Sequence, residues 1–249
     1  MPAVRRVYVL RLGVVEIDVA QLMPMEPERG ERYTGPVTAF LISDDNRHIL
    51  VDTGLSPDHI DDPTARIQPP LMTVQMRPED HIVHQLGQIG ITPTDIDAVI
   101  NTHFHFDHCG GNSLFDHAPF YVQRSHYDWS ANEDVPWRRD WDVAGLDYHL
   151  VDGDQRLFDG VEVVETPGHV PGHQSVVVSL EHTGTAILAG DAAQTHIMFE
   201  EERTVGMQDP EAGLVSIQKL KAIRDATGAQ VLVCHDIDNA YRELPEYYD

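Results

Sequence analysis

A short segment, from His103 to His108, concentrates side chains that bind metal ions. It reads HFHFDH, so three histidines and one aspartate fall within six positions. Successive side chains of an extended chain point in alternate directions, so His103 and His105 can face one ion. A turn directly after them would redirect Asp107 and His108 toward a second ion. Imidazole and carboxylate ligands without cysteine suit zinc and, less selectively, iron, manganese or cobalt.

Three further residues of ligand type each follow an apolar run. VEVVETPGH ends on His169, AILAGD ends on Asp191 and VLVCH ends on His235. Side chains on loops beyond strand ends can converge in one cleft while the sheets hold their backbones still. Seven ligands are too many for one tetrahedral ion, but they suit two ions that share a carboxylate and leave positions open for water. No G-x-S-x-G segment indicates a serine nucleophile.

The other histidines and both cysteines carry no such pattern. Cys109 and Cys234 are expected to be small buried residues. The histidines expected to be ordinary surface or core residues are His48, His59, His81, His84, His117, His126, His149 and His182.

The elements that position the ligands are predicted from short apolar runs. The first twenty residues alternate apolar and polar side chains, which predicts one or two opening strands. A helix is predicted within residues 78–91, and a strand followed by a helix within FYVQRSHYDW. Further strands are predicted at Val37–Ile42 and His48–Gly54, joined by a hairpin over Ser43–Arg47, at Asp97–Asn101, and in VEVVETPGH, SVVVSL, TAILAGDA and AQVLVCHD.

A longer helix is predicted between the last two of these strands. Asp209 and Pro210 are a typical helix start, and Gly228 is a typical end. One face of this helix is expected to carry Leu214, Ile217 and Leu220. The order of elements is mixed α/β, and 249 residues without a repeat or a linker predict one domain over residues 1–249.

Composition excludes several classes of protein. The formal charge of −24, from 41 acidic and 17 basic residues, argues against a nucleic-acid partner, because such proteins carry a basic footprint. No run approaches the roughly 20 apolar residues of a membrane span. The N-terminus does not resemble a secretory signal, and two cysteines are too few for a disulfide framework. A cytoplasmic location is therefore expected.

Taken together, these motifs resemble a known family. THFHFDHCGG resembles the H-x-H-x-D-H signature of the metallo-β-lactamase superfamily, and LVDTG, TPGHVPGH, GDAA and CHD follow that superfamily's order. The fuller combination is similar to the N-acyl homoserine lactone lactonases and to pyridoxolactonase. The resemblance implies an αββα sandwich, in which two mixed sheets are flanked by helices and the metals lie at one edge.

The resemblance also implies roles for individual residues. Asp191 would bridge two divalent metal ions, with zinc expected, and Asp52 and Thr102 would orient ligand histidines. His173 would do the same or would cap a loop. The first metal would be held by His103, His105 and His169, and the second by Asp107, His108 and His235.

The activity implied is opening of a lactone ring. A hydroxide bridging the metals would attack the carbonyl carbon of an N-acyl homoserine lactone, and Asp107 would deliver a proton to the leaving oxygen. The biological role would then be quorum quenching by destruction of a small-molecule signal. The alternatives are another hydrolase of the superfamily, acting on a pyridoxolactone-type lactone, a thioester or a phosphotriester, and a non-catalytic metal-binding protein.

One position departs from the lactonase pattern. Gln194 stands where these lactonases typically carry a tyrosine that contacts the substrate, and its amide can donate a hydrogen bond in place of the hydroxyl. The three tryptophans are expected to pack in the protein or at the interface of a homodimer, with a lid over the site as the alternative. The residues proposed for the substrate pocket are Met23, Leu71, Met72 and His196.

Overall fold

Two β-sheets form the centre of the protein. The computed structural model describes residues 4–18, 32–44, 46–67, 72–236 and 247–249. Within these residues the larger sheet has eight strands, in the order β13-β1-β2-β3-β5-β6-β7 with β4 paired to β1, and the smaller has five, in the order β12-β11-β10-β9-β8. The strands of the larger sheet are β1 (Arg6–Asp18), β2 (Arg32–Ser43), β3 (His48–Val51), β4 (Met72–Gln75), β5 (Ala98–Ile100), β6 (Pro119–Gln123), β7 (Asp147–Val151) and β13 (Tyr247–Tyr248). Those of the smaller sheet are β8 (Gln155–Phe158), β9 (Val161–Glu165), β10 (Gln174–Ser179), β11 (Thr185–Leu188) and β12 (Gln230–Leu232).

Both sheets are mixed. In the larger sheet β1, β2 and β3 pair antiparallel, whereas β3, β5, β6 and β7 pair parallel. In the smaller sheet β8 to β11 pair antiparallel and β12 joins β11 in parallel. Parallel neighbours place their carboxyl ends at the same edge, which brings the loops that follow β11 and β12 within reach of one another.

Continuous apolar runs in the central strands reflect burial on both faces. Ile49 and Val51 of β3 belong to the core between the two sheets, whereas Leu50 belongs to the core beneath the helices of the larger sheet. In the smaller sheet Leu188 of β11 faces the other sheet and Ile187 faces the outer helices. Each strand therefore divides its apolar residues between two cores, as alternation of side chains along a strand requires.

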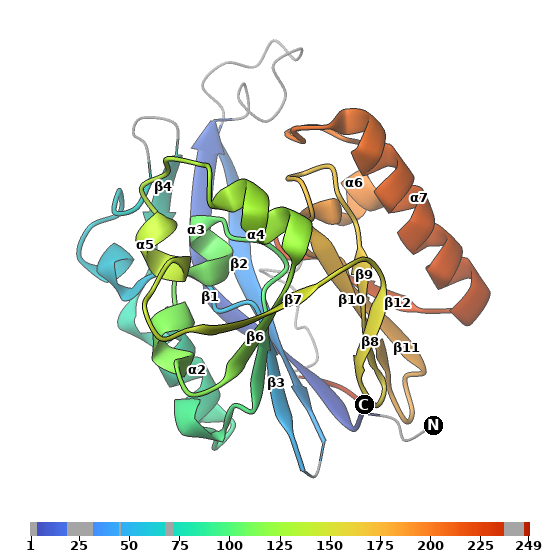
Figure 1. Ribbon diagram of the computed structural model, residues 1–249, viewed down its shortest axis with the longest axis horizontal. Helices are drawn as coiled ribbons and strands as arrows, with labels where there is room; N and C mark the ends of the chain where they lie inside the picture. The colour runs from blue at the N-terminus through green and yellow to red at the C-terminus, as the bar shows by residue number, and fades with distance from the viewer. Residues whose placement is uncertain (1–3, 19–31, 45, 68–71, 237–246) are drawn as a thin grey trace.

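Helices cover the outer face of each sheet (Figure 1). The helix α2 (Ile82–Gln88) packs Ile82 and Leu86 against the larger sheet. The helices α6 (His196–Glu200) and α7 (Pro210–Thr227) lie against the smaller sheet. The remaining α-helices in the described residues are α3 (Phe106–Cys109), α4 (Arg124–Ser130) and α5 (Arg138–Trp141). The predicted αββα sandwich is confirmed.

The predicted buried face of α7 was partly wrong. Asp209 caps the helix through a bond from the Ala212 N–H, and Gly228 ends it with a φ of 70°, as expected. However, Leu214 is 37% exposed, because the packed face begins one position earlier, at Gly213. A Cβ on Gly168 would lie 2.3 Å from the Cα of Gly213, so helix and loop approach each other too closely for side chains there.

The predicted strand His48–Gly54 ends earlier, at Val51. Asp52 has a φ of 62°, which is incompatible with an extended strand and turns the chain toward the ligand segment. None of the described helices is long and apolar enough to cross a membrane. A single domain over residues 1–249 stays a prediction.

Candidate metal centre

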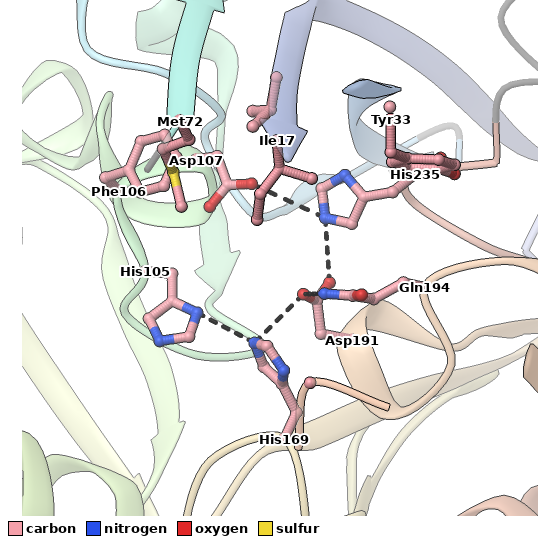
Figure 2. A pocket seen from close by; sticks show the side chains of 13 residues that line it. Ile17, Tyr33, Met72, His105, Phe106, Asp107, His169, Asp191, Gln194 and His235 are labelled. Carbon is pink, nitrogen blue, oxygen red and sulfur yellow. Dashed lines mark hydrogen bonds and ion pairs between the residues drawn. The ribbon is translucent and has the colours of Figure 1, made fainter. Parts of the chain in front are cut away.

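The seven predicted ligands lie together at the ends of strands, and Figure 2 shows five of them, His105, Asp107, His169, Asp191 and His235. Each stands on a loop or a short helix that directly follows a strand. His103 and His105 follow β5, and Asp107 and His108 lie in α3. The loop between β9 and β10 carries His169, the 3-10 turn after β11 carries Asp191, and the residues after β12 include His235.

Three histidines form what we call the first ligand group: His103, His105 and His169. The Nδ1 atom of His105 lies 2.9 Å from Nε2 of His103 and 3.0 Å from Nε2 of His169. Two nitrogen ligands on a tetrahedral zinc ion, each about 2.0–2.1 Å from it, lie about 3.3 Å apart. The three nitrogens are therefore close to the spacing that a small cation requires.

The second ligand group consists of Asp107, His108 and His235. The Oδ2 atom of Asp107 lies 3.8 Å from Nε2 of His108 and 3.7 Å from Nε2 of His235. All three ligand atoms lie within 4.8 Å of one another, and all three side chains are buried. This group differs from the first in containing a carboxylate.

Asp191 lies between the two groups and turns one oxygen toward each. Its Oδ1 atom is 3.3 Å from Nε2 of His108 and 3.2 Å from Nε2 of His235. Its Oδ2 atom is 3.2 Å from Nε2 of His169. This is the placement expected of a shared, bridging carboxylate.

Two buried atoms at the centre fit a cation. Among the described residues, Nε2 of His108 and Oδ1 of Asp191 have no hydrogen-bond partner. Leaving a buried polar atom unpaired costs about 1–3 kcal/mol. A divalent cation would satisfy both atoms, and the nitrogen and oxygen donors are those that zinc accepts.

Asp52 orients His108 of the second group through a hydrogen bond to the ring nitrogen that faces away from the cluster. Its Oδ2 atom accepts a hydrogen bond of 2.8 Å from Nδ1 of His108, which leaves Nε2 of that ring free to face the cluster. Asp52 also accepts bonds of 2.7 Å each from the main-chain N–H and the hydroxyl of Thr102. Such partners fix the tautomer and the direction of a ligand imidazole.

Two other ligand rings are oriented in the same way. The Thr102 hydroxyl, which donates to Asp52, lies 3.1 Å from Nδ1 of His103 and can accept from it. Nδ1 of His235 donates to the carbonyl oxygen of Pro36 at 2.8 Å, because a carbonyl can only accept. Both rings therefore present Nε2 to the cluster.

His173 acts on the main chain rather than on a ligand ring. Its Nε2 atom accepts the N–H of Asp191 at 3.0 Å. Its Nδ1 atom lies 2.9 Å from the Thr166 hydroxyl. Of the two roles predicted for His173, this geometry favours holding the loop that carries Asp191.

The pKa values of the ligand imidazoles shift in opposite directions in the two groups. Burial lowers the pKa of every histidine in the first group, well below the ordinary value for His103 and His105. Burial acts the same way on both histidines of the second group, but the carboxylates of Asp191 and Asp107 outweigh it and raise their pKa values. Negative charge therefore dominates the second group.

A pocket of about 280 Å³ opens onto the ligands. Its polar end consists of five of the seven ligands and of Gln194, whose amide donates to Oδ2 of Asp191 at 2.8 Å. Its apolar wall includes Val15 and Ile17 of β1, Met72 of β4, and Phe106. Figure 2 shows Met72, Phe106 and Ile17 on one side of the pocket, with Gln194 beside Asp191 on the other.

The residues predicted for the substrate pocket have different outcomes. Met72 and Gln194 line the pocket. His196 begins α6 and does not line it, and its main-chain N–H donates to Asp236. Met23 and Leu71 lie outside the described residues.

The tryptophans partly follow the packing prediction. Trp141 is buried and its ring stacks on Phe104 with centroids 4.7 Å apart. Trp137 instead lies with its ring 5.8 Å from that of His105 and 6.0 Å from that of Phe106, so it borders the site.

Some pocket residues were missed by sequence reasoning. Tyr33 lines the pocket, and its hydroxyl donates to the carbonyl oxygen of His235 at 2.5 Å. Phe106 stands between two ligands in the sequence, which was a signal that it borders the site. Val15, Ile17 and Tyr33 gave no such signal, because they lie on strands far from the motifs in sequence.

Comparison with known proteins agrees with this geometry. The family model described as the metallo-beta-lactamase superfamily matches residues 32–242. The N-acyl homoserine lactonase of Bacillus thuringiensis is 31% identical over 250 residues, which cover 98% of this chain and 99% of that protein. A lactonase of the same name from Azorhizobium caulinodans is 32% identical over 266 residues, with 98% of each chain covered.

Solved structures extend the similarity to three dimensions. The structure of an N-acyl homoserine lactone hydrolase, with its product N-hexanoyl-L-homoserine bound at the catalytic metal center, matches with a TM-score of 0.90. Identity to that protein is 30%, and the match covers 99% of this chain and 100% of the other. The histidine and aspartate clusters are typical of a site for two metals in this fold, and the findings support a metal-dependent hydrolase. The chain belongs to the metallo-β-lactamase superfamily, in the branch of the N-acyl homoserine lactonases.

Proposed function

We propose that the protein is a lactonase that uses two divalent cations, most simply zinc, to open N-acyl homoserine lactones, with quorum quenching as its role. The observation that carries the proposal is the pocket itself. One end holds the ligands of both groups, and the adjoining wall is apolar. Relatives that share about a third of the sequence over nearly the whole chain are N-acyl homoserine lactonases.

The shape of the pocket suits a substrate with a polar ring and an apolar tail. A lactone ring at the ligand end would place its carbonyl beside Asp191 and Gln194. The acyl chain would then lie along Val15, Met72 and Phe106, where apolar contact with a flexible methionine accommodates chains of different length.

Each side chain at the polar end has a distinct part in the reaction. The first ligand group would hold one cation, the second group the other, and Asp191 would bind both. Cations bound there would lower the pKa of a water molecule and polarise the lactone carbonyl. Asp107 is the member of the second group that has a carboxylate, and it lines the pocket, where this carboxylate can hold a proton and deliver it to the ring oxygen that leaves.

Gln194 is suited to binding the substrate carbonyl. Its amide nitrogen carries two hydrogens, one of which is directed at Oδ2 of Asp191. The second hydrogen can donate to a carbonyl oxygen in the pocket and so stabilise charge that develops there.

A second candidate is hydrolysis of another ester by the same site. The observation that favours it is Gln194 at the position where the lactonases that this chain resembles carry a tyrosine. A pyridoxolactone-type lactone, a thioester or a phosphotriester would require the same cations but different contacts in the pocket.

The experiment is a pH-indicator assay on purified protein of known cation content. The substrates are butanoyl to dodecanoyl homoserine lactones, simple γ-lactones, a pyridoxolactone, a glutathione thioester and a phosphotriester. Rapid opening of the homoserine lactones, lost on chelation and restored by zinc or cobalt, is the expected result. A protein that holds about two cations per chain yet prefers another substrate would replace the first candidate with the second.

Inactivity toward every substrate would favour a non-catalytic metal-binding protein. His105→Ala is the matched variant for the lactonase, because it removes the ligand that lies between the other two histidines of the first group. Its lactone hydrolysis should fall to background.

A further inference from the structure

The imidazole of His126 is a buried polar group that the proposed reaction does not use. It lies in α4 and is 1% exposed. Its Nε2 atom lies 3.3 Å from the Ser130 hydroxyl of the same helix. The same Nε2 atom accepts the main-chain N–H of Phe104 at 2.8 Å, and Nδ1 donates to the carbonyl oxygen of Pro171, also at 2.8 Å. The two partners fix the tautomer, because an amide N–H can only donate and a carbonyl can only accept.

These two hydrogen bonds join the loops that carry the first ligand group. Phe104 stands between the two histidines that follow β5 of the larger sheet. Pro171 stands two residues after His169, in the loop that follows β9 of the smaller sheet. One imidazole therefore ties the main chains of two loops that arise from different sheets.

The surroundings of His126 hold the ring in this position. The ring of Phe104 packs 5.0 Å away and that of Trp129 5.7 Å away. A Cβ on Gly172 would lie 2.3 Å from the main-chain nitrogen of His126, so a glycine is needed for the loop to pass this close to α4. Two aromatic rings therefore pack against His126, and the lack of a side chain at Gly172 lets the loop approach α4.

We propose that His126 is a positioning residue that sets the distance between His169 and the two histidines after β5. The proposal rests on the cation site of the proposed function, but not on the identity of the substrate. Both ring nitrogens of His126 are bonded to main-chain atoms of the two loops, so its effect passes mainly through these loops, and its ring also lies 6.2 Å from that of His103. Loss of both bonds lets the loops separate and weakens binding by the first ligand group.

The test compares two variants of His126 with a matched control. His126→Phe keeps an aromatic ring and removes the hydrogen bonds to both loops and to Ser130, whereas His126→Gln keeps an acceptor and a donor. The control is His59→Phe, because His59 is also 1% exposed but neither of its ring nitrogens has a hydrogen-bond partner among the described residues. The measurements are zinc affinity by competition with a chromophoric chelator, the visible spectrum of the cobalt form, and urea unfolding of the cation-free protein.

We expect His126→Phe to weaken one of the two zinc affinities, that of the first ligand group, by about 10–100-fold. This is the range seen when hydrogen-bond partners of metal ligands are lost. The cobalt spectrum should change with it. His126→Gln should recover most of the affinity, and His59→Phe should leave both affinities and the spectrum unchanged. If His126→Phe does not fold, the cobalt spectrum of His126→Gln must still differ from that of the wild type.

Unchanged zinc affinity in folded His126→Phe would overturn the proposal, as would an equal loss in His59→Phe. A glutamine variant no better than the phenylalanine variant would also overturn it, because the hydrogen bonds would then not be the cause. These measurements need no substrate. A failure of lactone hydrolysis with both cations bound would therefore contradict the proposed function and leave this inference standing.

Discussion

The two ligand groups are built from similar side chains but in opposite electrostatic surroundings. The first group has three imidazoles, and burial keeps their pKa values low. The second group has a carboxylate of its own, Asp107, and Asp52 lies behind it at 2.8 Å from His108. The first group is therefore a neutral site held by hydrogen bonds, whereas the second is a site of buried negative charge. Loss of a main-chain hydrogen bond should weaken cation binding by the first group, and loss of a carboxylate should weaken cation binding by the second group.

The largest effect should come from the one residue that both groups share. Asp191→Ala removes both carboxylate oxygens that face the two groups. We expect cation content to fall from about two per chain to one or fewer, and hydrolysis to fall by more than about 100-fold, since a lost ligand costs at least as much as a lost partner of a ligand. Metal analysis after dialysis, with the kinetics of the same sample, measures both. A variant that keeps two cations would show that the groups are independent.

Substitution of the residues that orient the ligands should affect the two groups differently. Asp52→Asn removes the charge that supports His108, and we expect the affinity of the second group to fall by about 10–100-fold. Thr102→Val removes a hydroxyl that lies 3.1 Å from Nδ1 of His103 but keeps the carboxylate, and the loss should be smaller and fall on the first group. Stepwise zinc titration measures both affinities, and equal losses in the two variants would contradict the comparison.

The sequence predicted that these seven residues would lie together, because each follows an apolar run. Such runs mark strands that are buried on both faces, and polar side chains at their ends must lie where the strands stop. Asp191 after β11 and His235 after β12 lie as this rule requires, at the same edge. The predicted αββα sandwich followed from the family resemblance, which these same motifs carried.

Two of the edge strands, β7 and β8, and the remote contacts were not predicted. β7 and β8 form edges of the two sheets and carry exposed polar residues, so neither has an apolar run. His126 was interpreted as an ordinary histidine, because nothing in RSHYDW shows that α4 brings it against Phe104 and Pro171. Only the packing of the two sheets creates that contact.

Low pH should reduce the stability of the protein through His126, which lies beside the first ligand group. Burial lowers the pKa of His126 to about 4, below the value of about 6.5 in an unfolded chain. The unfolded chain therefore takes up the proton first as the pH falls, and the contribution of this residue to stability, complete above about pH 6.5, is lost below it. Between about pH 7.5 and about pH 5.5 the loss amounts to about 1.4 kcal/mol.

Urea unfolding of the cation-free protein across that range measures this loss. His126→Gln, which cannot take up the proton, should lose about 1.4 kcal/mol less of its unfolding free energy than the wild type. Parallel pH profiles for the two proteins would show that His126 does not titrate differently on folding.

The smallest effect should come from Gln194, which contacts Asp191 on the side of the first group. Its side-chain amide donates to Oδ2 of Asp191, whereas its main-chain carbonyl accepts the N–H of His235 in the second group. Gln194→Ala removes the first bond and keeps the second. Because a hydrogen bond contributes about 0.5–1.5 kcal/mol, we expect kcat/KM for the lactone to fall by about 2–12-fold.

Cation binding in Gln194→Ala should stay close to that of the wild type, because every ligand remains and Asp191 loses only one neutral hydrogen-bond donor. Gln218→Ala is the matched control, since the amide of Gln218 donates to Glu202 on the surface, and it should change neither quantity. A loss of zinc from Gln194→Ala would show that the glutamine acts by orienting Asp191 rather than by binding the substrate. It would then be a positioning residue for Asp191, and the pocket would need another donor for the carbonyl oxygen, because the Tyr33 hydroxyl already donates its one proton to the carbonyl oxygen of His235.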